Sequence, residues 1–308
     1  MSSSSFIFTL LIGLGPILSM SSSSWFFCWV GLEISFIGFI PMLFSSENMN
    51  VNKEAAMKYF CIQALASAVL LVSGMSIYYY DAENFLMGII FLFSLCLKLG
   101  VVPGHFWVPT VSLGTGWFGC FLMLGPMKLV PFQVLVLFCE KTPIYTPMVL
   151  VLGGLSAMAG AFLGNNQTTV RGMMGASSVA HSGWLLLAST YGSLWAYMVT
   201  YIFLLGFTLS FFMQKENLSA SFCLLTLSGV PPFIMFLMKL LVLLNLSWLN
   251  GSSIIFVVLP ILGTVLSLFF YLSFTYAYYL QSKAGSSGMN LPFWGVNFMS
   301  VLAVMMLI

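Results

Sequence analysis

Charged side chains are scarce in this sequence. Asp, Glu, Lys and Arg make up 5% of the 308 residues, whereas 60% are hydrophobic. An average soluble domain carries about 25% charged residues, so a soluble fold is excluded. Nine basic and seven acidic residues give a formal net charge of +2. Because these charges are few and dispersed, they cannot form a phosphate-binding surface, and nucleic acid is excluded as a partner.

Metal and redox motifs are also lacking. No two cysteines stand at a C-x-x-C spacing, and none lies near His105 or His181 in a pattern typical of zinc or iron–sulfur sites. We interpret the six cysteines as apolar helix residues and expect no metal site in this chain. An Arg-rich amphipathic leader is likewise missing from the first residues. If the protein belongs to an organelle, we therefore expect it to be made inside that organelle.

Long apolar runs fill the rest of the sequence. A membrane-spanning helix needs about 20 mostly apolar residues. On that rule we predict an all-α, polytopic membrane protein of about eleven transmembrane helices, near residues 5–22, 24–44, 56–80, 84–103, 115–138, 144–163, 171–190, 192–213, 219–248, 252–280 and 291–308. The connecting segments are too short for a soluble domain, so residues 1–308 are expected to form a single transmembrane domain.

The loop charges predict an orientation. With eleven crossings, one side of the membrane holds Lys53, Lys58, Arg171, Lys215 and Lys283, whereas the opposite loops hold Lys141 alone. The positive-inside rule then places the N-terminus in the matrix or cytoplasm and the C-terminus outside.

Two predicted helices contain helix-breaking residues. One ends with Pro103-Gly104 five residues after Lys98, and the other contains Gly229-Val-Pro-Pro232 seven residues before Lys239. Proline removes an intrahelical hydrogen bond, so both helices are expected to break or kink there. One interrupted helix in each half is typical of transporters built from inverted repeats. Ordinary packing kinks are the alternative. The repeats would cover about 1–138 and 144–280, followed by a terminal helix.

A few ionisable side chains fall well inside apolar segments. A lone Lys or Glu at a helix centre costs about 2.5–3.5 kcal/mol, so such residues normally face a partner or a wet cavity. Static pairing, or satisfaction of a backbone carbonyl at a helix break, is the alternative. Five such residues are present: Glu33, Lys98, Lys128, His181 and Lys239. Because they occur together, we favour a function in proton transfer for them.

The numbers of these charges imply titration. Three buried lysines face one buried carboxylate, so not all of them can be permanently charged and paired within the chain. Burial disfavours the protonated form of a lysine, whereas a nearby carboxylate favours it. Movement of Glu33 relative to Lys98 would therefore change how readily Lys98 holds a proton. We expect Ser94, Ser177 and Ser178, together with water, to bridge gaps between the buried groups. Glu54 and Lys58, spaced i, i+4, are interpreted as an ordinary helix-end ion pair.

Several strings resemble one known family as a set. They are Trp29-Val-Gly-Leu-Glu33, Glu54-Ala-Ala-Met-Lys58-Tyr-Phe-Cys-Ile-Gln63-Ala-Leu-Ala-Ser67, Lys98-Leu-Gly-Val-Val-Pro103-Gly-His105-Phe-Trp107-Val-Pro109, Arg171-Gly-Met-Met-Gly-Ala-Ser-Ser-Val-Ala-His181-Ser-Gly-Trp184 and Gly229-Val-Pro-Pro232. In this order, over about residues 1–245, they resemble the subunit 2 family of NADH:ubiquinone oxidoreductase, the antiporter-like membrane subunits of mitochondrial respiratory complex I. Beyond residue 250 only hydropathy agrees.

The resemblance implies roles for individual residues. Glu33 matches the family's membrane glutamate, Lys98 its paired lysine on a broken helix, Lys128 the central lysine, and Lys239 the lysine of the second broken helix. His181 has the weaker claim to a relay role. Two departures are visible: Thr110 stands where an acid is expected, and Phe233–Met238 lacks the usual Ser/Thr-Gly pair and further proline.

The function implied is a proton-translocating subunit of the inner mitochondrial membrane. By the resemblance, the N-terminus faces the matrix and the C-terminus the intermembrane space. NADH, FMN, iron–sulfur clusters and ubiquinone would be bound by other subunits, and this chain would bind no cofactor. Its expected partners are the other membrane-arm subunits and phospholipid, with protons and water as its only small-molecule substrates. An autonomous cation/proton antiporter subunit and a non-pumping spacer of the membrane arm are the alternatives.

Overall fold

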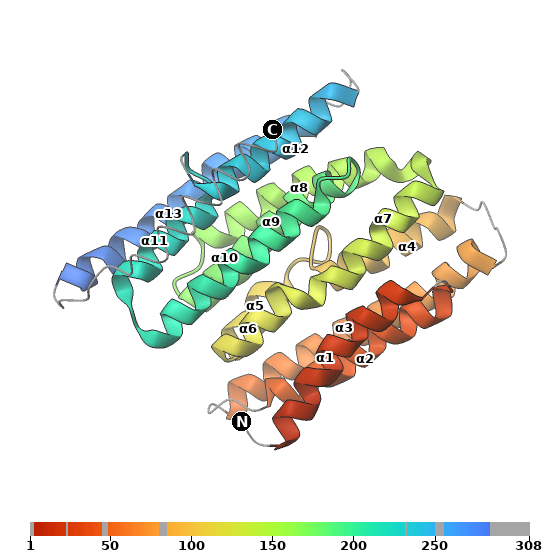
Figure 1. Ribbon diagram of the computed structural model, residues 1–308, viewed down its shortest axis with the longest axis horizontal. Helices are drawn as coiled ribbons and strands as arrows, with labels where there is room; N and C mark the ends of the chain where they lie inside the picture. The colour runs from red at the N-terminus through yellow and green to blue at the C-terminus, as the bar shows by residue number, and fades with distance from the viewer. Residues whose placement is uncertain are drawn as a thin grey trace. The chain divides into compact units, whose positions relative to one another are not determined.

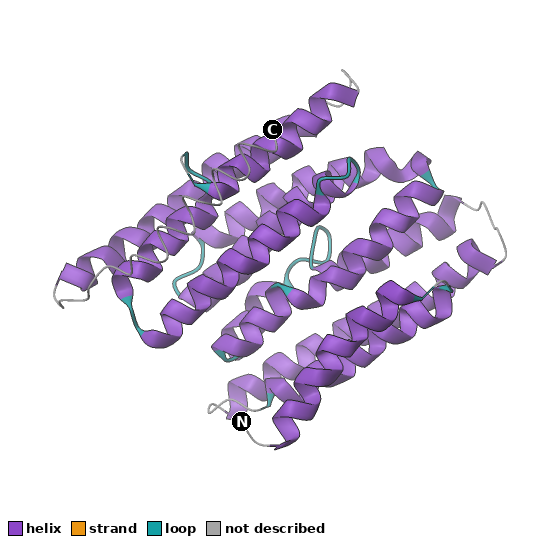
Figure 2. Ribbon diagram, viewed as in Figure 1, coloured by secondary structure: helices purple, strands orange, loops and turns teal. Residues whose placement is uncertain are grey.

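The structure is a computed structural model, and it describes residues 3–22, 24–44, 49–79, 85–231, 233–249 and 256–283. Within these ranges the chain is helical and contains no strand (Figure 2). The all-α class predicted from the sequence is confirmed. The chain divides into two compact units, Met1–Met148 and Val149–Ile308.

The first unit is built from seven α-helices and two 3-10 turns of the described part of the chain (Figure 1). Its elements are α1 (Ser3–Ser21), α2 (Trp25–Leu43), α3 (Met49–Tyr79), α4 (Phe85–Leu99), α5 (Trp107–Gly114), α6 (Trp117–Leu124), η1 (Pro126–Lys128), α7 (Leu129–Lys141) and η2 (Pro143–Tyr145). Helices α1 and α2 pack closely because small residues meet between them: a Cβ added to Gly31 would lie 2.7 Å from the carbonyl oxygen of Gly15.

The second unit holds α8 (Thr146–Asn165, from Val149 on), α9 (Val170–Ser189), α10 (Leu194–Gln214), α11 (Asn217–Ser228), α12 (Ile234–Leu249) and α13 (Val258–Lys283). Helix α9 is its central element, since nearly every side chain from Gly172 to Ser189 is buried. Helices α8 and α9 approach closely at another small-residue contact, where a Cβ added to Gly183 would lie 2.6 Å from the carbonyl oxygen of Gly153.

Length and composition support a membrane location. Among the described residues, six helical stretches are long and apolar enough to cross a membrane: Trp25–Leu43, Val51–Tyr79, Trp117–Lys141, Pro143–Asn165, Leu194–Gln214 and Val258–Gln281. Shorter apolar helices cover Phe6–Ser21, Phe85–Leu99, Asn217–Ser228 and Ile234–Leu246. The predicted helix over 291–308 lies outside the described residues, so the count of eleven crossings and the repeat boundaries stay predictions.

The region after Lys98 differs from the sequence prediction. The helix predicted over 84–103 ends at Leu99, and the segment 103–116, expected to be a loop, contains the short helix α5. Pro109 is the third residue of α5. Proline is tolerated there because the first amide groups of a helix have no intrahelical acceptor. A proline in a segment predicted to be a loop therefore lies in the first turn of a helix.

The segment predicted as one helix over 115–138 is interrupted. Helix α6 ends at Leu124, a 3-10 turn covers Pro126–Lys128, and α7 starts at Leu129. Pro126 cannot donate a backbone hydrogen bond, so the α-helical pattern cannot run through this point. The chain thus has a third interruption besides the two that were predicted, and Lys128 lies in it.

Candidate functional site

Lys98 and Glu33 form an ion pair inside the first unit. The Lys98 Nζ lies 3.3 Å from the Glu33 Oε1, and the lysine side chain is 4% exposed and the glutamate side chain 19% exposed. Glu33 comes from the middle of α2, and Lys98 is the penultimate residue of α4. The carboxylate is less buried than the sequence suggested. The pair is therefore a charged contact that is shielded on the lysine side and partly open on the glutamate side.

The break after Lys98 is stabilised by side-chain hydrogen bonds. Gly100 has a φ of +68°, which favours glycine, and it ends α4. The indole Nε1 of Trp107 donates to the carbonyl oxygen of Leu97 at 3.0 Å, and the Gln63 amide donates to the carbonyl oxygen of Lys98 at 3.3 Å. Carbonyl groups at a helix end have no intrahelical partner. These two bonds satisfy them and hold the backbone of Lys98 in place.

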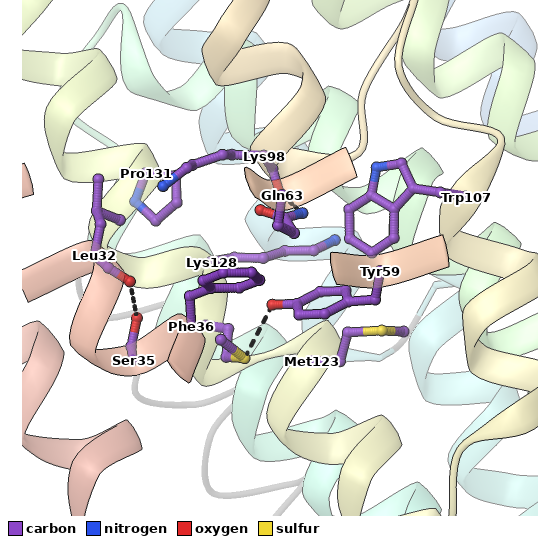
Figure 3. A pocket seen from close by; sticks show the side chains of 11 residues that line it. Leu32, Ser35, Phe36, Tyr59, Gln63, Lys98, Trp107, Met123, Lys128 and Pro131 are labelled. Atoms are coloured by element: carbon purple, nitrogen blue, oxygen red, sulfur yellow. Dashed lines mark hydrogen bonds between the residues drawn. The ribbon is translucent and has the colours of Figure 1, made fainter. Parts of the chain in front are cut away.

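Lys128 and Lys98 line the same cavity. Its volume is about 30 Å³, which is room for two or three water molecules, since about 10–15 Å³ accommodates one. The wall includes Tyr59, Gln63 and Trp107. In Figure 3 the Lys128 side chain extends toward Trp107, whereas the Lys98 side chain extends the opposite way, toward Pro131. The cavity therefore brings two buried lysines to one small space.

The second unit carries a separate polar cluster around His181. His181 lies on α9 and is 3% exposed. Its Nδ1 lies 3.0 Å from the hydroxyl of Tyr197 on α10, and its Nε2 lies 3.3 Å from the hydroxyl of Tyr271 on α13. The ring of Tyr201 packs against the imidazole at a centroid distance of 4.9 Å. Both ring nitrogens of this histidine thus face a hydroxyl group.

Lys239 lies beside the second break. Its Nζ donates to the carbonyl oxygen of Ser228 at 2.9 Å and lies 5.9 Å from the centre of the Trp184 ring. Gly229 follows with a φ of +79° and ends α11. The second break therefore forms despite the altered sequence between Phe233 and Met238, while Pro232 lies outside the described residues.

A smaller cavity joins these two features of the second unit. It has a volume of about 10 Å³ and is lined by His181, Trp184, Lys239 and Tyr271, among others. This is close to the space that one water molecule requires. The structure therefore brings His181 and Lys239 to one space, as it brings Lys98 and Lys128 to another.

The serines expected to bridge the buried groups make local bonds. Ser94 and Ser178 donate to the carbonyl oxygens of Phe91 and Gly175, three residues earlier in their own helices. Ser177 donates to the carbonyl oxygen of Met174 in the same way. Each of these three hydrogen bonds therefore stays within a single helix.

Three residues of these clusters were missed or undervalued from the sequence. Gln63 stood inside a quoted string without an assigned role, and Tyr197 and Tyr271 were not singled out. Tyrosine is common in apolar helices, so nothing in a single sequence separates these two from the other ten. The spacing of Glu54 and Lys58 was interpreted correctly as a local ion pair, and both side chains are exposed.

The chemistry of the site is acid–base chemistry between side chains. Among the residues that the structure describes, no group of three His, Cys, Asp or Glu side chains is placed to hold a metal ion. The groups that are brought together are lysine, glutamate, histidine and tyrosine side chains. Such groups exchange protons.

Comparison with known proteins decides the family. The transmembrane family described as NADH:quinone oxidoreductase/Mrp antiporter matches residues 22–219. NADH-ubiquinone oxidoreductase chain 2 of Albinaria caerulea is 36% identical over 273 residues, which cover 89% of this chain and 88% of that protein. The chain belongs to the NADH-ubiquinone oxidoreductase chain 2 family.

Solved structures share the fold of this chain 2 family member. A chain of respiratory complex I from Thermus thermophilus superposes with a TM-score of 0.79 at 22% identity, covering 99% of this chain and 76% of that one. A chain of the Mrp complex from Dietzia sp. gives 0.79 at 16% identity, covering 87% and 59%. The antiporter-like fold is thereby confirmed. As a chain 2 family member, the protein is a membrane-embedded, antiporter-like subunit of the complex I type.

Proposed function

We propose that this chain translocates protons across the inner mitochondrial membrane as a core membrane subunit of NADH:ubiquinone oxidoreductase. The observation that carries the proposal is the ion pair of Glu33 and Lys98 beside a cavity that Lys128 also lines. Electron transfer from NADH to ubiquinone takes place in other subunits, which bind the FMN and iron–sulfur clusters. Charge or conformational changes reach this chain and alter the Glu33–Lys98 pair.

The pair acts as a gate in this proposal. Two charges that attract at 3.3 Å stabilise the protonated form of Lys98. When the carboxylate moves away or is neutralised, the buried ammonium loses its partner and gives up a proton to the cavity. Lys128 is the next residue to accept the proton in the first unit, and Lys239 and His181 accept and release protons in the second. Returning protons must be blocked, because one charge moved across the membrane is worth about 2.3 kcal/mol per 100 mV.

We place the N-terminus on the matrix side and the C-terminus on the intermembrane side, from the excess of Lys and Arg in the loops on the N-terminal side. The partners in this proposal are the other membrane-arm subunits and phospholipid. Occurrence of the same fold in a chain of respiratory complex I from Thermus thermophilus supports assembly with other complex I subunits.

The proposal is tested by Lys98→Ala in the assembled complex, with Lys58→Ala as the matched control. Lys58 is a lysine of the same unit, but its side chain is 47% exposed. The number of protons moved per electron pair should fall in Lys98→Ala and stay at the parent value in Lys58→Ala. A normal ratio in Lys98→Ala would leave a spacer that holds its neighbours and pumps nothing.

An autonomous cation/proton antiporter is the second candidate, because the Mrp complex contains a chain of the same fold. Affinity purification from native membranes distinguishes the two. A complex I subunit isolates together with the other subunits of that enzyme. Isolation of the chain free of them would favour the antiporter.

A further inference from the structure

Tyr197, His181 and Tyr271 form a continuous hydrogen-bonded triad inside the second unit. The three side chains come from three different helices, α10, α9 and α13. Their exposed fractions are 0%, 3% and 2%, respectively. The Tyr197 hydroxyl lies 3.0 Å from one imidazole nitrogen, and the Tyr271 hydroxyl lies 3.3 Å from the other. The two hydroxyls are thus in hydrogen-bonding contact with different nitrogens of the His181 ring.

A neutral histidine in this position can adopt either of two hydrogen-bonding arrangements, one for each tautomer of its ring. A neutral imidazole carries one N–H donor and one bare nitrogen acceptor. One tyrosine therefore donates to the bare nitrogen, while the other accepts from the N–H. Moving the ring proton from one nitrogen to the other exchanges the two tyrosines' roles and leaves every group neutral. In a buried site this avoids the high cost of an isolated charge.

We propose that Tyr197 and Tyr271 are proton-relay residues that, with His181 between them, carry a proton between the Lys239 cavity and the interface of α9 with α10. This inference rests on the proposed proton-translocating function and names two further residues for it. Tyr271, His181 and Lys239 line one cavity of about 10 Å³, enough for about one water molecule. The triad therefore begins where Lys239 can deliver or receive a proton.

The Lys239 ammonium passes a proton, through water in the cavity, to the Tyr271 oxygen. The original Tyr271 proton passes to Nε2, the Nδ1 proton passes to the Tyr197 oxygen, and the original Tyr197 proton passes to a water molecule at the interface of α9 with α10. Lys239 becomes neutral, the two tyrosines and the histidine stay neutral, and the imidazole changes tautomer. Rotation of the hydroxyls, and transfer of the ring proton from Nε2 back to Nδ1 through water rather than through the tyrosines, reset the relay.

Two phenylalanine substitutions and a matched control test the relay. Tyr197→Phe and Tyr271→Phe each remove one hydroxyl contact to His181. Tyr201→Phe removes a hydroxyl from a ring that packs on the same imidazole, yet the Tyr201 hydroxyl has no hydrogen-bond partner among the residues that the structure describes. In proteoliposomes of the assembled complex, the first two variants should lower the proton-to-electron ratio, and Tyr201→Phe should keep the parent ratio. A loss in Tyr201→Phe as large as in the other two would reduce the triad to packing and overturn the relay.

The double variant separates a relay from two independent packing effects. Because the tyrosines act in series, Tyr197→Phe combined with Tyr271→Phe should lower the ratio no further than either single change. Additive losses would contradict a single path. His181→Gln offers a second approach if a phenylalanine variant fails to assemble. Glutamine keeps a donor and an acceptor but cannot exchange a proton between two nitrogens, so the ratio must fall here as well, and a parent ratio overturns the relay.

Failure of the relay can be told apart from failure of the proposed function. If both phenylalanine variants pump like the parent while Lys98→Ala lowers the ratio, the relay is wrong and proton translocation by this chain stands. If Lys98→Ala also pumps like the parent, the proposed function itself is wrong.

Discussion

Lys239 bonds the carbonyl oxygen of Ser228, 11 residues earlier in the chain, at 2.9 Å. The ammonium thus serves as the cap of α11, the helix that ends where the second break begins. The first break is built the other way round: Lys98 lies on the helix before the break, and Trp107 and Gln63 bind the free carbonyls. In both units, a buried lysine is tied to the end of a broken helix, so any movement of the break changes its surroundings.

Gly229→Ala should displace Lys239. A Cβ at this position would lie 2.7 Å from the Lys239 Nζ, and the backbone φ of +79° disfavours any side chain. Gly192→Ala is the matched control, because Gly192 has a φ of +78° with nothing within 4 Å of an added Cβ. Both variants should lose about 1–2 kcal/mol from the left-handed backbone. Only Gly229→Ala should lower the proton-to-electron ratio. Equal proton-to-electron ratios in the two variants would show that Lys239 takes no part in proton transfer.

Gln63→Leu should destabilise the first break. Leucine fills a similar volume with an apolar side chain, but it lacks the amide that donates to the carbonyl oxygen of Lys98. Leaving a buried carbonyl without that bond costs about 1–3 kcal/mol. Thermal inactivation of NADH:ubiquinone reductase activity in the purified complex measures the loss. Gln63→Glu is not a suitable control because it adds a charge near the Glu33–Lys98 pair; Gln214→Leu, at the exposed end of α10, is the appropriate one.

Unchanged thermal inactivation in Gln63→Leu would contradict this account of the first break. Such a result would mean that the carbonyl of Lys98 finds another donor at no cost. A similar loss of stability in Gln214→Leu would also remove the specific interpretation, since that variant leaves the break untouched.

Much of the fold followed from the sequence because apolar length and turn residues fix where helices can be. The helices around Glu33, Arg171 and Trp195 agree with the predicted ranges within a few residues. Helix α5 was missed because Pro109 marks a loop in most contexts and is tolerated only in a first turn. The Gly125-Pro126 pair was a visible signal for the third break, but it stands within an apolar run long enough for an uninterrupted span.

The buried lysines of the site were predictable from the sequence, whereas the tyrosines around His181 were not. Charge inside an apolar segment is costly, so Lys98, Lys128 and Lys239 stood out in the sequence. Tyr197 and Tyr271 did not, because a tyrosine is at home in an apolar helix whether or not its hydroxyl contacts a histidine. Only the packing of three helices around His181 distinguishes them. Roles in proton transfer for all of these residues stay predictions.

Glu33→Gln should change the pH dependence of turnover. The amide cannot stabilise a buried ammonium as the carboxylate does, so the protonated form of Lys98 is lost at a lower pH. The alkaline limb of the activity profile should therefore move to lower pH. Glu54→Gln is the control, since Glu54 pairs with Lys58 in an exposed contact on α3. Coincident profiles for the parent and Glu33→Gln would contradict a gate made of this pair.

We propose that buried lysines of both units carry the protons that this subunit moves. The most direct test is the proton-to-electron ratio of the assembled complex in sealed proteoliposomes, for the parent, Lys98→Met and Lys239→Met. Methionine keeps a side chain of similar length and removes the titratable group. We predict a lower ratio in each variant while electron transfer from NADH to an artificial acceptor continues at the parent rate. A parent ratio in both variants would contradict the account.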